Sequence, residues 1–285
     1  MSEQNNGNVI LKIRSIYNSL TKAEKKVADY VLENVPEVIY LSITELAEKC
    51  GTGETTIVRF CRRIGLSGFQ EFKLNIAKEI AEPETSIHEN ISFNDPLEVL
   101  VQKITTENTL ALSNTVKLLS LSELEKAVDA IINARKIQFY GVGASGYTAL
   151  DAKYKFMRLG LNVDANLDAH IQAISAVSLT EKDVAVGISF SGSTKDTVET
   201  CKLAKEAGAK VIAITNYARS PITSVADIVL LTSAKETPLR SGALTSKIAQ
   251  LHILDILYTA VAVRLKDQTV NMLSKTAKAV LEKLY

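Results

Sequence analysis

The most evident chemistry in this chain lies in a hydroxyl-rich run, SFSGST, from Ser189 to Thr194. The run ends an apolar stretch, Val184–Ser189, that predicts a strand, and it precedes a helical pattern that starts near Lys195. Backbone N–H groups at a helix N-terminus attract anions, and adjacent hydroxyls donate further hydrogen bonds to the same oxygens. The pattern therefore predicts a phosphate-binding loop that needs no metal ion. Ordinary helix capping by serine and threonine is the alternative interpretation.

A second loop of this kind is predicted from the glycine-rich run GVGASG, Gly141–Gly146, which follows the predicted strand Ile137–Tyr140. Taken literally, the run is the G-x-G-x-x-G pattern of dinucleotide-binding domains, and Asp164 lies near the expected place of a ribose-binding acid. A nicotinamide-cofactor domain is therefore one hypothesis. The other is that Ser145 and the SFSGST run meet around one phosphate, because the carboxyl ends of parallel strands share one edge of a sheet. A dinucleotide fold does not require a second hydroxyl-rich turn, which favours the phosphate hypothesis.

Both loops need a sheet to position them, and the chain after residue 134 alternates between predicted strands and helices. That alternation is typical of an α/β fold, here an α-β-α sandwich with a five-stranded parallel sheet. We assign residues 96–285 to this domain. Two helices are expected between Pro96 and Ala134, and a long apolar helix, Ala243–Val263, is expected in the core or at a subunit interface. The predicted strands are Ile137–Tyr140, Asn162–Ala165, Val184–Ser189, Val211–Thr215 and Ile228–Thr232.

Residues 1–80 predict an all-α domain of short helices. Two capping boxes, in which Ser or Thr precedes Glu by three residues, begin at Thr21 and Ser42. A third helix, Glu54–Ile64, follows the tight turn Gly51-Thr52-Gly53. Two short helices joined by a glycine-containing turn have the layout of a helix-turn-helix, whose second helix enters the major groove of DNA. The alternative is a plain helical bundle with a solvated basic face.

The second helix of this predicted motif presents threonine and arginine side chains to DNA. Threonine hydroxyls bond to phosphates or bases, and arginine clamps phosphate or pairs with guanine. The formal net charge of the chain, +1, neither supports nor excludes DNA binding, because a local basic face is sufficient. The candidate contacts are Thr52, Glu54, Thr55, Thr56, Arg59, Arg62 and Arg63, with Lys73 extending the phosphate contacts.

Composition indicates an ordinary globular protein, with 46% hydrophobic and 23% charged residues. The three cysteines lack the spacing of a zinc site and are expected to be buried, reduced thiols in a cytoplasmic protein. The N-terminus lacks the apolar core of a signal peptide. Polar residues interrupt the apolar stretch that begins at Ile248, so we interpret it as a buried helix and not as a membrane span. The polar segment 81–95 is interpreted as a linker.

The run ITELAEKCGTGETTIVRFCRRIGLSGFQEFK resembles the N-terminal domain of the RpiR family of sugar-responsive transcription regulators. The most specific part of the resemblance is carried by Arg59-Phe60, Gly65, Gly68-Phe69 and Phe72-Lys73. The chain departs from the family at the entry to the second helix, where a Val-Ser pair is usual and Thr52-Gly53 stands here. That departure removes one hydroxyl that could contact phosphate.

Residues from about Ile131 to Val263 resemble the SIS (sugar isomerase) domain of phosphosugar isomerases and RpiR-type regulators. The motifs GVGASG, ISFSGSTKDTVE, VIAITN and ADIVLLT carry this resemblance in family order. It implies a phosphorylated sugar as effector, operator DNA as partner, no cofactor and no metal, and a homodimer or homotetramer that more often represses than activates. The implied ligand contacts are Gly143, Ser145, Ser189, Ser191, Gly192, Ser193 and Thr194, with a sugar-facing Glu236.

The attached helix-turn-helix favours a sensor over an enzyme. Sugar isomerisation needs a general base near the reacting carbons, and Glu236 is the one acidic residue that we can place near the predicted site. We therefore predict a DNA-binding transcriptional regulator without catalysis. The alternatives are a phosphosugar isomerase with an accessory helical domain and a nicotinamide-sensing repressor.

Overall fold

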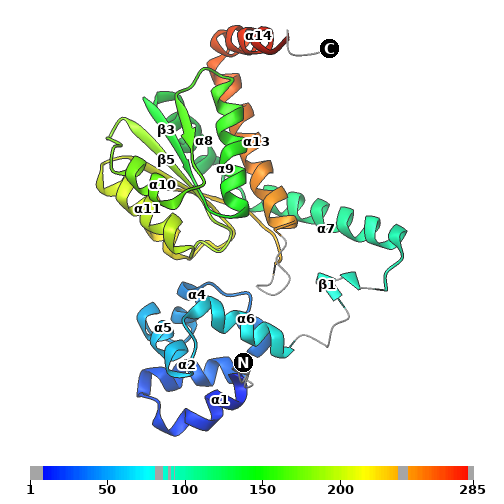
Figure 1. Ribbon diagram of the computed structural model, residues 1–285, viewed down its shortest axis with the longest axis vertical. Coiled ribbons are helices and arrows are strands. Elements are labelled where there is room, and N and C mark those ends of the chain that lie inside the picture. Colours follow the sequence, from blue (N-terminus) through cyan, green and yellow to red (C-terminus); the bar gives the residue numbers. More distant parts are fainter. Residues whose placement is uncertain (1–8, 81–85, 89–90, 93, 237–242, 282–285) are drawn as a thin grey trace, which may run out of the picture. The chain divides into compact units, whose positions relative to one another are not determined.

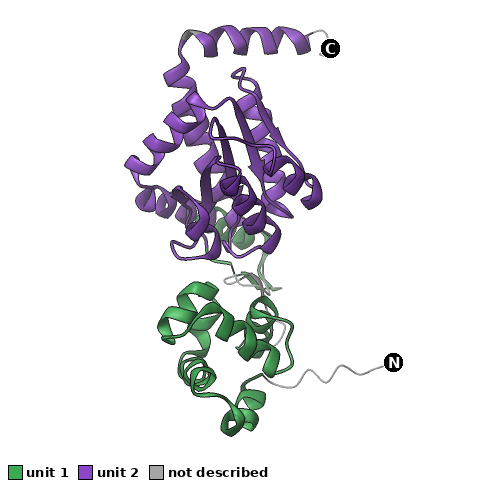
Figure 2. Ribbon diagram, turned by 90° about the vertical axis from the view of Figure 1, so that its left-hand side faces the viewer, with its two compact units in different colours: residues 1–106, 235–242 green, residues 107–234, 243–285 purple. Residues whose placement is uncertain are grey.

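The computed structural model describes residues 9–80, 86–88, 91–92, 94–236 and 243–281 (Figure 1). The chain divides into two compact units (Figure 2). The helical unit comprises Met1–Thr106 with Lys235–Gly242, and the sheet unit comprises Glu107–Ala234 with Ala243–Tyr285. The first boundary between these units falls inside helix α7 (Leu97–Leu118).

The helical unit is built from short helices around one apolar core. Its largest fully buried side chains include Ile57, Phe60 and Phe72, and the Phe60 and Phe72 rings pack edge to face with centroids 6.0 Å apart. The three helices expected from Thr21, Ser42 and Glu54 are all present. The elements are α1 (Val9–Ile16), η1 (Tyr17–Ser19), α2 (Lys22–Glu33), α3 (Val35–Val38), α4 (Ile43–Lys49), α5 (Glu54–Arg63) and α6 (Phe69–Ile80).

Both predicted capping boxes are confirmed. The Thr21 hydroxyl accepts from the backbone N–H of Glu24, and the Glu24 carboxylate accepts from the Thr21 N–H. Ser42 and Glu45 make the same reciprocal pair at the start of α4. Each box satisfies two of the N–H groups that an α-helix leaves without an internal partner.

The predicted linker, residues 81–95, contains two short strands that the sequence did not predict. Strands β1 (Ser86–His88) and β2 (Ile91–Ser92) pair in an antiparallel sheet. Ile91 is buried, which gives this polar segment one apolar anchor.

The sheet unit contains a five-stranded sheet in the order β4-β3-β5-β6-β7, with every neighbouring pair parallel. This confirms the predicted α/β sandwich and its five strands. Because β3 and β5 lie side by side while their connections lead away in opposite directions, the winding of the chain reverses between them. The strands are β3 (Lys136–Tyr140), β4 (Val163–Ala165), β5 (Asp183–Ile188), β6 (Lys210–Thr215) and β7 (Ile228–Leu231).

Helices cover both faces of this sheet (Figure 1). One core joins the strands to α8, α9 and α13, and a second core joins the opposite face to α10, α11 and α12. Apolar side chains on both faces explain why the strands read as continuous hydrophobic runs. The helices are α8 (Leu121–Asn133), α9 (Ala144–Met157), α10 (Ala169–Ala176), α11 (Lys195–Glu206), α12 (Pro221–Val225), α13 (Thr245–Leu265) and α14 (Asp267–Leu281).

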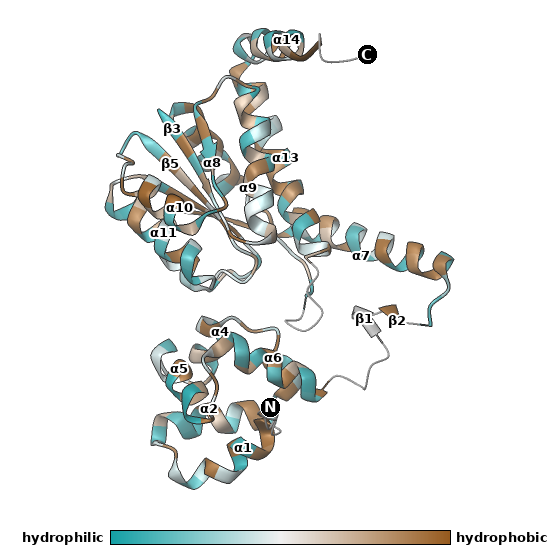
Figure 3. Ribbon diagram, in the orientation of Figure 1, coloured by the Kyte–Doolittle hydropathy of each residue, from teal (hydrophilic) through white to brown (hydrophobic). Residues whose placement is uncertain are grey.

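Helix α13 is buried on one face, which agrees with the expectation that it lies in the core or at a subunit interface. Leu254 and Leu257 are fully buried, whereas Val263 is 66% exposed. Hydrophobic residues alternate with hydrophilic ones along its length (Figure 3). Among the described helices, α13 alone is long and apolar enough to cross a membrane, and 33% of its most apolar window is buried. That test rests on length and composition, and one partly buried helix is weak support for a membrane span.

The three cysteines are free and buried, as predicted. Burial raises the pKa of the Cys50 thiol to about 11 and that of the Cys61 and Cys201 thiols to about 12. Thiols with such raised pKa values are unreactive, because the thiolate is the reactive form.

Candidate functional site

Two loops begin side by side at the point where the winding of the sheet reverses. We call Gly141–Gly146 the glycine loop and Ser189–Thr194 the serine loop. Strands β3 and β5, which lead into them, pair in register with Tyr140 opposite Gly187. A Cβ added to Gly141 would lie 3.1 Å from the carbonyl oxygen of Ile188. The sequence expectation that the two loops start at one edge of the sheet is therefore confirmed.

The glycines of these loops are required by close backbone packing. A Cβ on Gly141 would lie 2.8 Å from the carbonyl oxygen of Ser145, and one on Gly146 would lie 3.0 Å from the carbonyl oxygen of Gly141. Gly192 has φ +61°, and its Cβ would lie 2.2 Å from the Ser220 hydroxyl. The glycine pattern is thus explained by a tight strand-to-helix turn, without a dinucleotide.

Hydrogen bonds within the serine loop hold its hydroxyls in place. Ser189 is 2% exposed, and its hydroxyl donates to the Thr194 hydroxyl at 3.2 Å. The Ser193 N–H donates to the Ser191 hydroxyl, also at 3.2 Å. Ser191, Ser193 and Thr194 are half-buried, so they line the loop surface while Ser189 lies beneath it.

The helices after both loops begin without side-chain caps. Gly143, the N-cap of α9, has no side chain that could cap the helix, and the side chain of Thr194, the N-cap of α11, makes no capping bond. The first N–H groups of a helix lack a helical acceptor, and each N-terminus carries about half a positive charge. In α9 the third N–H group, that of Gly146, already donates to the carbonyl oxygen of Gly143 at 3.0 Å. Thr194 does not act as a cap, so the capping interpretation fails at this position. Two positive helix ends with adjacent hydroxyls are the arrangement expected of an anion site.

Gln250 is a buried polar residue beside the glycine loop that the sequence did not indicate. It lies on α13 and is 2% exposed. Its amide Nε2 donates to the Ser145 hydroxyl at 3.2 Å, and its Oε1 accepts from the Thr148 hydroxyl at 3.2 Å. A glutamine inside an apolar helical pattern was a detectable signal, because a buried amide needs partners.

Glu236, the predicted sugar-facing acid, is 5% exposed. It belongs to the segment Lys235–Gly242, which groups with the helical unit and not with the loops. Its place beside the ligand therefore stays a prediction.

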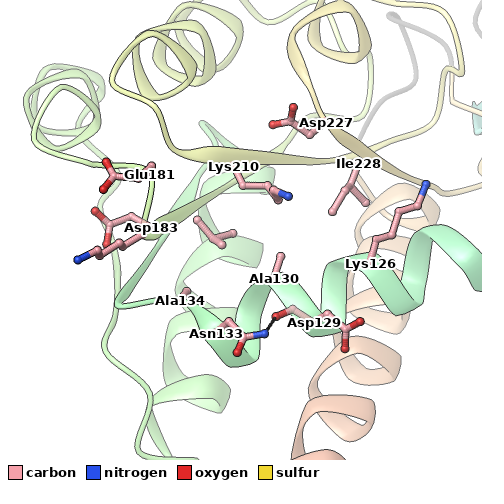
Figure 4. Close-up of a pocket in the computed structure, with 12 residues that line it drawn as sticks. Lys126, Asp129, Ala130, Asn133, Ala134, Glu181, Asp183, Lys210, Asp227 and Ile228 are labelled. Carbon is pink, nitrogen blue, oxygen red and sulfur yellow. Dashed lines mark hydrogen bonds between the residues drawn. The ribbon is translucent and has the colours of Figure 1, made fainter.

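A hollow of about 470 Å³ lies at the amino ends of β5, β6 and β7, at the sheet edge opposite the two loops (Figure 4). Two of its carboxylates already have partners. Asp183 accepts two hydrogen bonds from Arg135, which hold the pKa of its carboxyl below the usual range, and Asp227 accepts from Lys205. Lys182 and Lys210 also line this hollow, but they stand among four acidic residues, which disfavours a phosphate.

Helix α5 carries most of the predicted DNA contacts. Thr55, Arg59 and Arg62 are exposed, and neither arginine makes a hydrogen bond or ion pair within the described part of the chain. Thr56 is only 9% exposed. Thr52 is half-buried, and its hydroxyl has no partner among the described residues.

Two predicted contacts are partly occupied inside the helical unit. Arg63 donates to the carbonyl oxygen of Ser19 at 2.7 Å and lies 3.5 Å from the Glu24 carboxylate. Glu54 accepts a hydrogen bond from the Thr44 hydroxyl. These bonds tie α5 to η1, α2 and α4. Arg59 and Arg62 make no such bonds, although Arg59 interacts electrostatically with the Glu24 carboxylate.

Lys73 does not lie where a phosphate contact requires it. It is 5% exposed, and its Nζ donates to the carbonyl oxygen of Leu41 at 2.8 Å. Burial lowers the pKa of its ammonium to about 8, an effect that Glu45 partly offsets. We therefore withdraw Lys73 from the DNA contacts, because its amino group is buried in the helical core and bonded to Leu41.

Family models match both halves of the chain. Residues 7–83 match the helix-turn-helix domain of the rpiR family, and residues 130–260 match the SIS domain. An uncharacterized HTH-type transcriptional regulator of Caldanaerobacter subterraneus is 44% identical over 95% of this chain and 96% of its own length. The chain belongs to the rpiR family of HTH-type transcriptional regulators.

Further relatives agree with this membership. The HTH-type transcriptional regulator HexR of Pseudomonas aeruginosa is 36% identical to this regulator over 90% of both chains. Among solved structures, the Vibrio vulnificus NanR protein complexed with ManNAc-6P matches with a TM-score of 0.86 and 28% identity over 97% of this chain and 99% of that one. The sugar isomerase domain of an RpiR transcription factor from Sphaerobacter thermophilus, 24% identical with a TM-score of 0.58, shares the fold.

The nicotinamide hypothesis is not favoured by these findings. The glycine loop lies in a matched SIS domain, and Asp164 accepts a hydrogen bond from Lys153 at 2.6 Å. Burial raises the pKa of the Asp164 carboxyl, but the bonds from Lys153 and the Ala165 N–H together lower it below its usual value. The proposed ribose acid thus already has a cationic partner.

Proposed function

We propose that this regulator binds operator DNA through α5 in the cytoplasm and that a phosphorylated sugar bound at the glycine and serine loops controls it. The observation that carries the ligand half is the pair of uncapped helix N-termini at neighbouring strand ends, with Ser145, Ser191, Ser193 and Thr194 beside them. Those groups suit one phosphate, because all of them donate hydrogen bonds. Repression is the sign of control that we expect.

For DNA, the proposed contacts divide into two classes. Arg59 and Arg62 lie on the exposed face of α5 and would reach bases or phosphates. Thr55 lies at the N-terminal end of that helix and would anchor the backbone of the duplex, whereas the Thr52 hydroxyl is buried and would reach a phosphate only if the turn before α5 shifted. Arg63 contributes less, since Ser19 and Glu24 already engage it.

For the ligand, the neighbour NanR supplies the class of compound, because its structure is complexed with ManNAc-6P. In this regulator the phosphate would occupy the loops, and Glu236 would face the sugar. Glu236 provides at most one general base, so we propose binding without isomerisation. Incubation with fructose 6-phosphate or ManNAc-6P should produce no isomer, and multiple turnovers would contradict the sensor.

A homodimer or homotetramer is the proposed assembly. Large apolar side chains are exposed on α9 and α13, which pack against each other in the sheet unit. Tyr154 is 58% exposed, Met157 50% and Val263 66%. A second copy would cover this surface, and a symmetric dimer would read two operator half-sites about 34 Å apart or a multiple of that spacing.

The decisive experiment separates the two halves of the proposal. DNA binding to the region upstream of its own gene is measured with and without each phosphosugar, for the parent, Arg59→Ala, and the double variant Ser145→Ala with Ser191→Ala. We expect Arg59→Ala to lose DNA and keep sugar binding, and the double variant to keep DNA and lose its response. A normal response from the double variant would show that the phosphate site lies elsewhere.

A further inference from the structure

Gln250 connects two helices of the sheet unit through a buried hydrogen-bond chain. It lies on α13, and both of its polar atoms reach α9. Nε2 donates to the Ser145 hydroxyl at 3.2 Å, and Oε1 accepts from the Thr148 hydroxyl at 3.2 Å. Gln250 is 2% exposed and Thr148 is fully buried, so water does not compete for these bonds.

The Gln250 amide turns its oxygen toward Thr148 and its N–H groups toward Ser145. The Thr148 hydroxyl has a second acceptor, the carbonyl oxygen of Ala144, also at 3.2 Å. Ser145 Oγ also lies 3.5 Å from Oε1, a longer contact than the 3.2 Å one from Nε2. A ligand that offers an acceptor oxygen to Ser145 Oγ would therefore replace its 3.5 Å contact with Oε1 before the 3.2 Å bond from Nε2.

We propose that Gln250 is a positioning residue for the phosphate site, an inference that rests on the proposed function. A serine hydroxyl has one proton and two lone pairs. When the Gln250 N–H occupies a lone pair of Ser145, the hydroxyl proton keeps only the 3.5 Å contact with Oε1 and can turn to a phosphate oxygen. The amide thereby orients Ser145 as a donor before the ligand arrives, which reduces the ordering that binding requires.

A matched control exists on the other side of the glycine loop. Gln172 on α10 is also fully buried, and its Nε2 donates to the carbonyl oxygens of Gly141 at 2.8 Å and Asn166 at 2.7 Å. It holds backbone groups at the ends of β3 and β4 and bonds to no loop hydroxyl among the described residues. Gln172→Met therefore tests the effect of losing a buried amide near the loop without losing the orientation of Ser145.

The test is a double-mutant cycle on the full chain, with binding measured by calorimetry. The probes are inorganic phosphate, fructose 6-phosphate and ManNAc-6P, and the variants are Gln250→Met, Gln250→Glu, Ser145→Ala, Gln172→Met and the double variants with Ser145→Ala. Gln250→Met should weaken binding about tenfold, as expected for one hydrogen bond to a charged ligand. Gln250→Glu should weaken it more, because its carboxylate would accept the Ser145 proton.

The cycle distinguishes positioning from a structural role. Gln250→Met should cause no further loss once Ser145 is alanine, whereas the effect of Gln172→Met should add to that of Ser145→Ala. Unchanged binding by Gln250→Met, or additive losses at Gln250 and Ser145, would overturn the positioning role alone. If the parent protein bound none of the three probes, the proposed function would be overturned as well. Thermal unfolding of each variant reports whether it is folded. If Gln250→Met does not fold, Gln250→Glu serves as the second variant for the same test.

Discussion

The glycine and serine loops of the sheet unit and helix α5 of the helical unit both offer hydrogen-bond donors to phosphate oxygens, but they position these donors differently. The loops use backbone N–H groups and short hydroxyls, fixed by glycines that a single Cβ would displace. Helix α5 uses long arginine side chains on a helix whose inner face is buried by Ile57, Phe60 and Cys61. A site built on backbone is rigid and shaped for one group, whereas a site built on long side chains adapts to an extended surface.

The comparison also shows how each site can be separated from the stability of its unit. In the loops, the residues that would bind the ligand are the residues that shape the turn, so many substitutions change both properties. On α5, Arg59 and Arg62 extend from the helix without bonds to the described residues around them. Substitution there should change DNA binding while stability stays constant.

The largest effect is expected from Gly192→Ala, which should disrupt the conformation of the serine loop. The φ of +61° and a Cβ 2.2 Å from the Ser220 hydroxyl make alanine both strained and crowded. We expect about 4 kcal/mol less stability of the sheet unit and no measurable phosphosugar binding. Calorimetric unfolding and ligand titration measure the two effects.

Gly53→Ala is the matched control on the DNA-binding side. Gly53 has φ −96°, and a Cβ there would meet nothing within 4 Å. Alanine at this N-cap should lower stability by at most about 1 kcal/mol. If Gly192→Ala and Gly53→Ala lowered stability equally, the serine loop would not depend on its backbone conformation more than the turn before α5 does, and the comparison between the two sites would fail.

The second prediction concerns Lys73 and pH. Because its pKa is lowered to about 8 from 10.5, the unfolded chain binds more protons than the folded one between those pH values. Stability should therefore rise with pH across that window, by up to about 3 kcal/mol, and the burial penalty should be fully present below pH about 8. The unfolding midpoint of the helical unit, measured by calorimetry from pH 7 to 10, reports this change.

Lys73→Met is the reference for that measurement. Methionine has a similar volume and does not titrate, so the difference between parent and variant removes the contributions of cysteines, tyrosines and exposed lysines. Identical pH profiles for the two proteins would mean that the Lys73 ammonium is solvated, and its withdrawal from the DNA contacts would then lose its basis.

The third prediction divides the arginines of α5. Arg62→Ala should weaken operator binding about tenfold and reduce the dependence of affinity on salt by about one counterion, with unchanged stability. Arg63→Ala should weaken DNA binding less and lower stability by about 1 kcal/mol, because Ser19 and Glu24 lose a partner. DNA titrations at several salt concentrations measure affinity and its salt dependence, and thermal unfolding measures stability. Equal changes in affinity and stability for the two variants would contradict this division.

The smallest effect is expected from Gly53→Ser. Gly53 is the N-cap of α5 and makes no side-chain bond to the helix. Serine should cap the helix and raise stability by a few tenths of a kcal/mol, and it adds a hydroxyl beside the DNA. A small rise in both the unfolding midpoint and the operator affinity checks the prediction, and weaker DNA binding would indicate that this turn must stay free of side chains.

Local patterns predicted most of the fold. The five strands, the capping boxes at Thr21 and Ser42, and the start of α5 at Glu54 all lie within two residues of their expected places. Each of these depends on neighbours in sequence, through hydrophobic period and hydrogen bonds across one turn. The strands β1 and β2 were missed, because two- and three-residue strands leave too short a pattern.

The candidate site was predicted less completely. Residue type identified Ser145 and Ser191 as hydroxyl donors, and the same reasoning selected Lys73 because lysine binds phosphate. Whether a lysine is exposed depends on which turn of α6 faces the core, and the apolar residues Phe69, Phe72 and Ile76 place Lys73 inside. Gln250 was missed because its partners, Ser145 and Thr148, are more than a hundred residues away in the chain.

The sequence by itself therefore determined the class of fold, the two loop motifs and the membership in a family of DNA-binding regulators. These follow from residue types and short spacings, which survive without any three-dimensional information. Only the tertiary structure decided which hydroxyls line the loop surface, that Thr194 leaves α11 uncapped, that Lys73 is buried and that Gln250 reaches Ser145. Burial and long-range hydrogen bonds are properties of how helices pack on the sheet and on each other, and that packing depends on the whole chain at once.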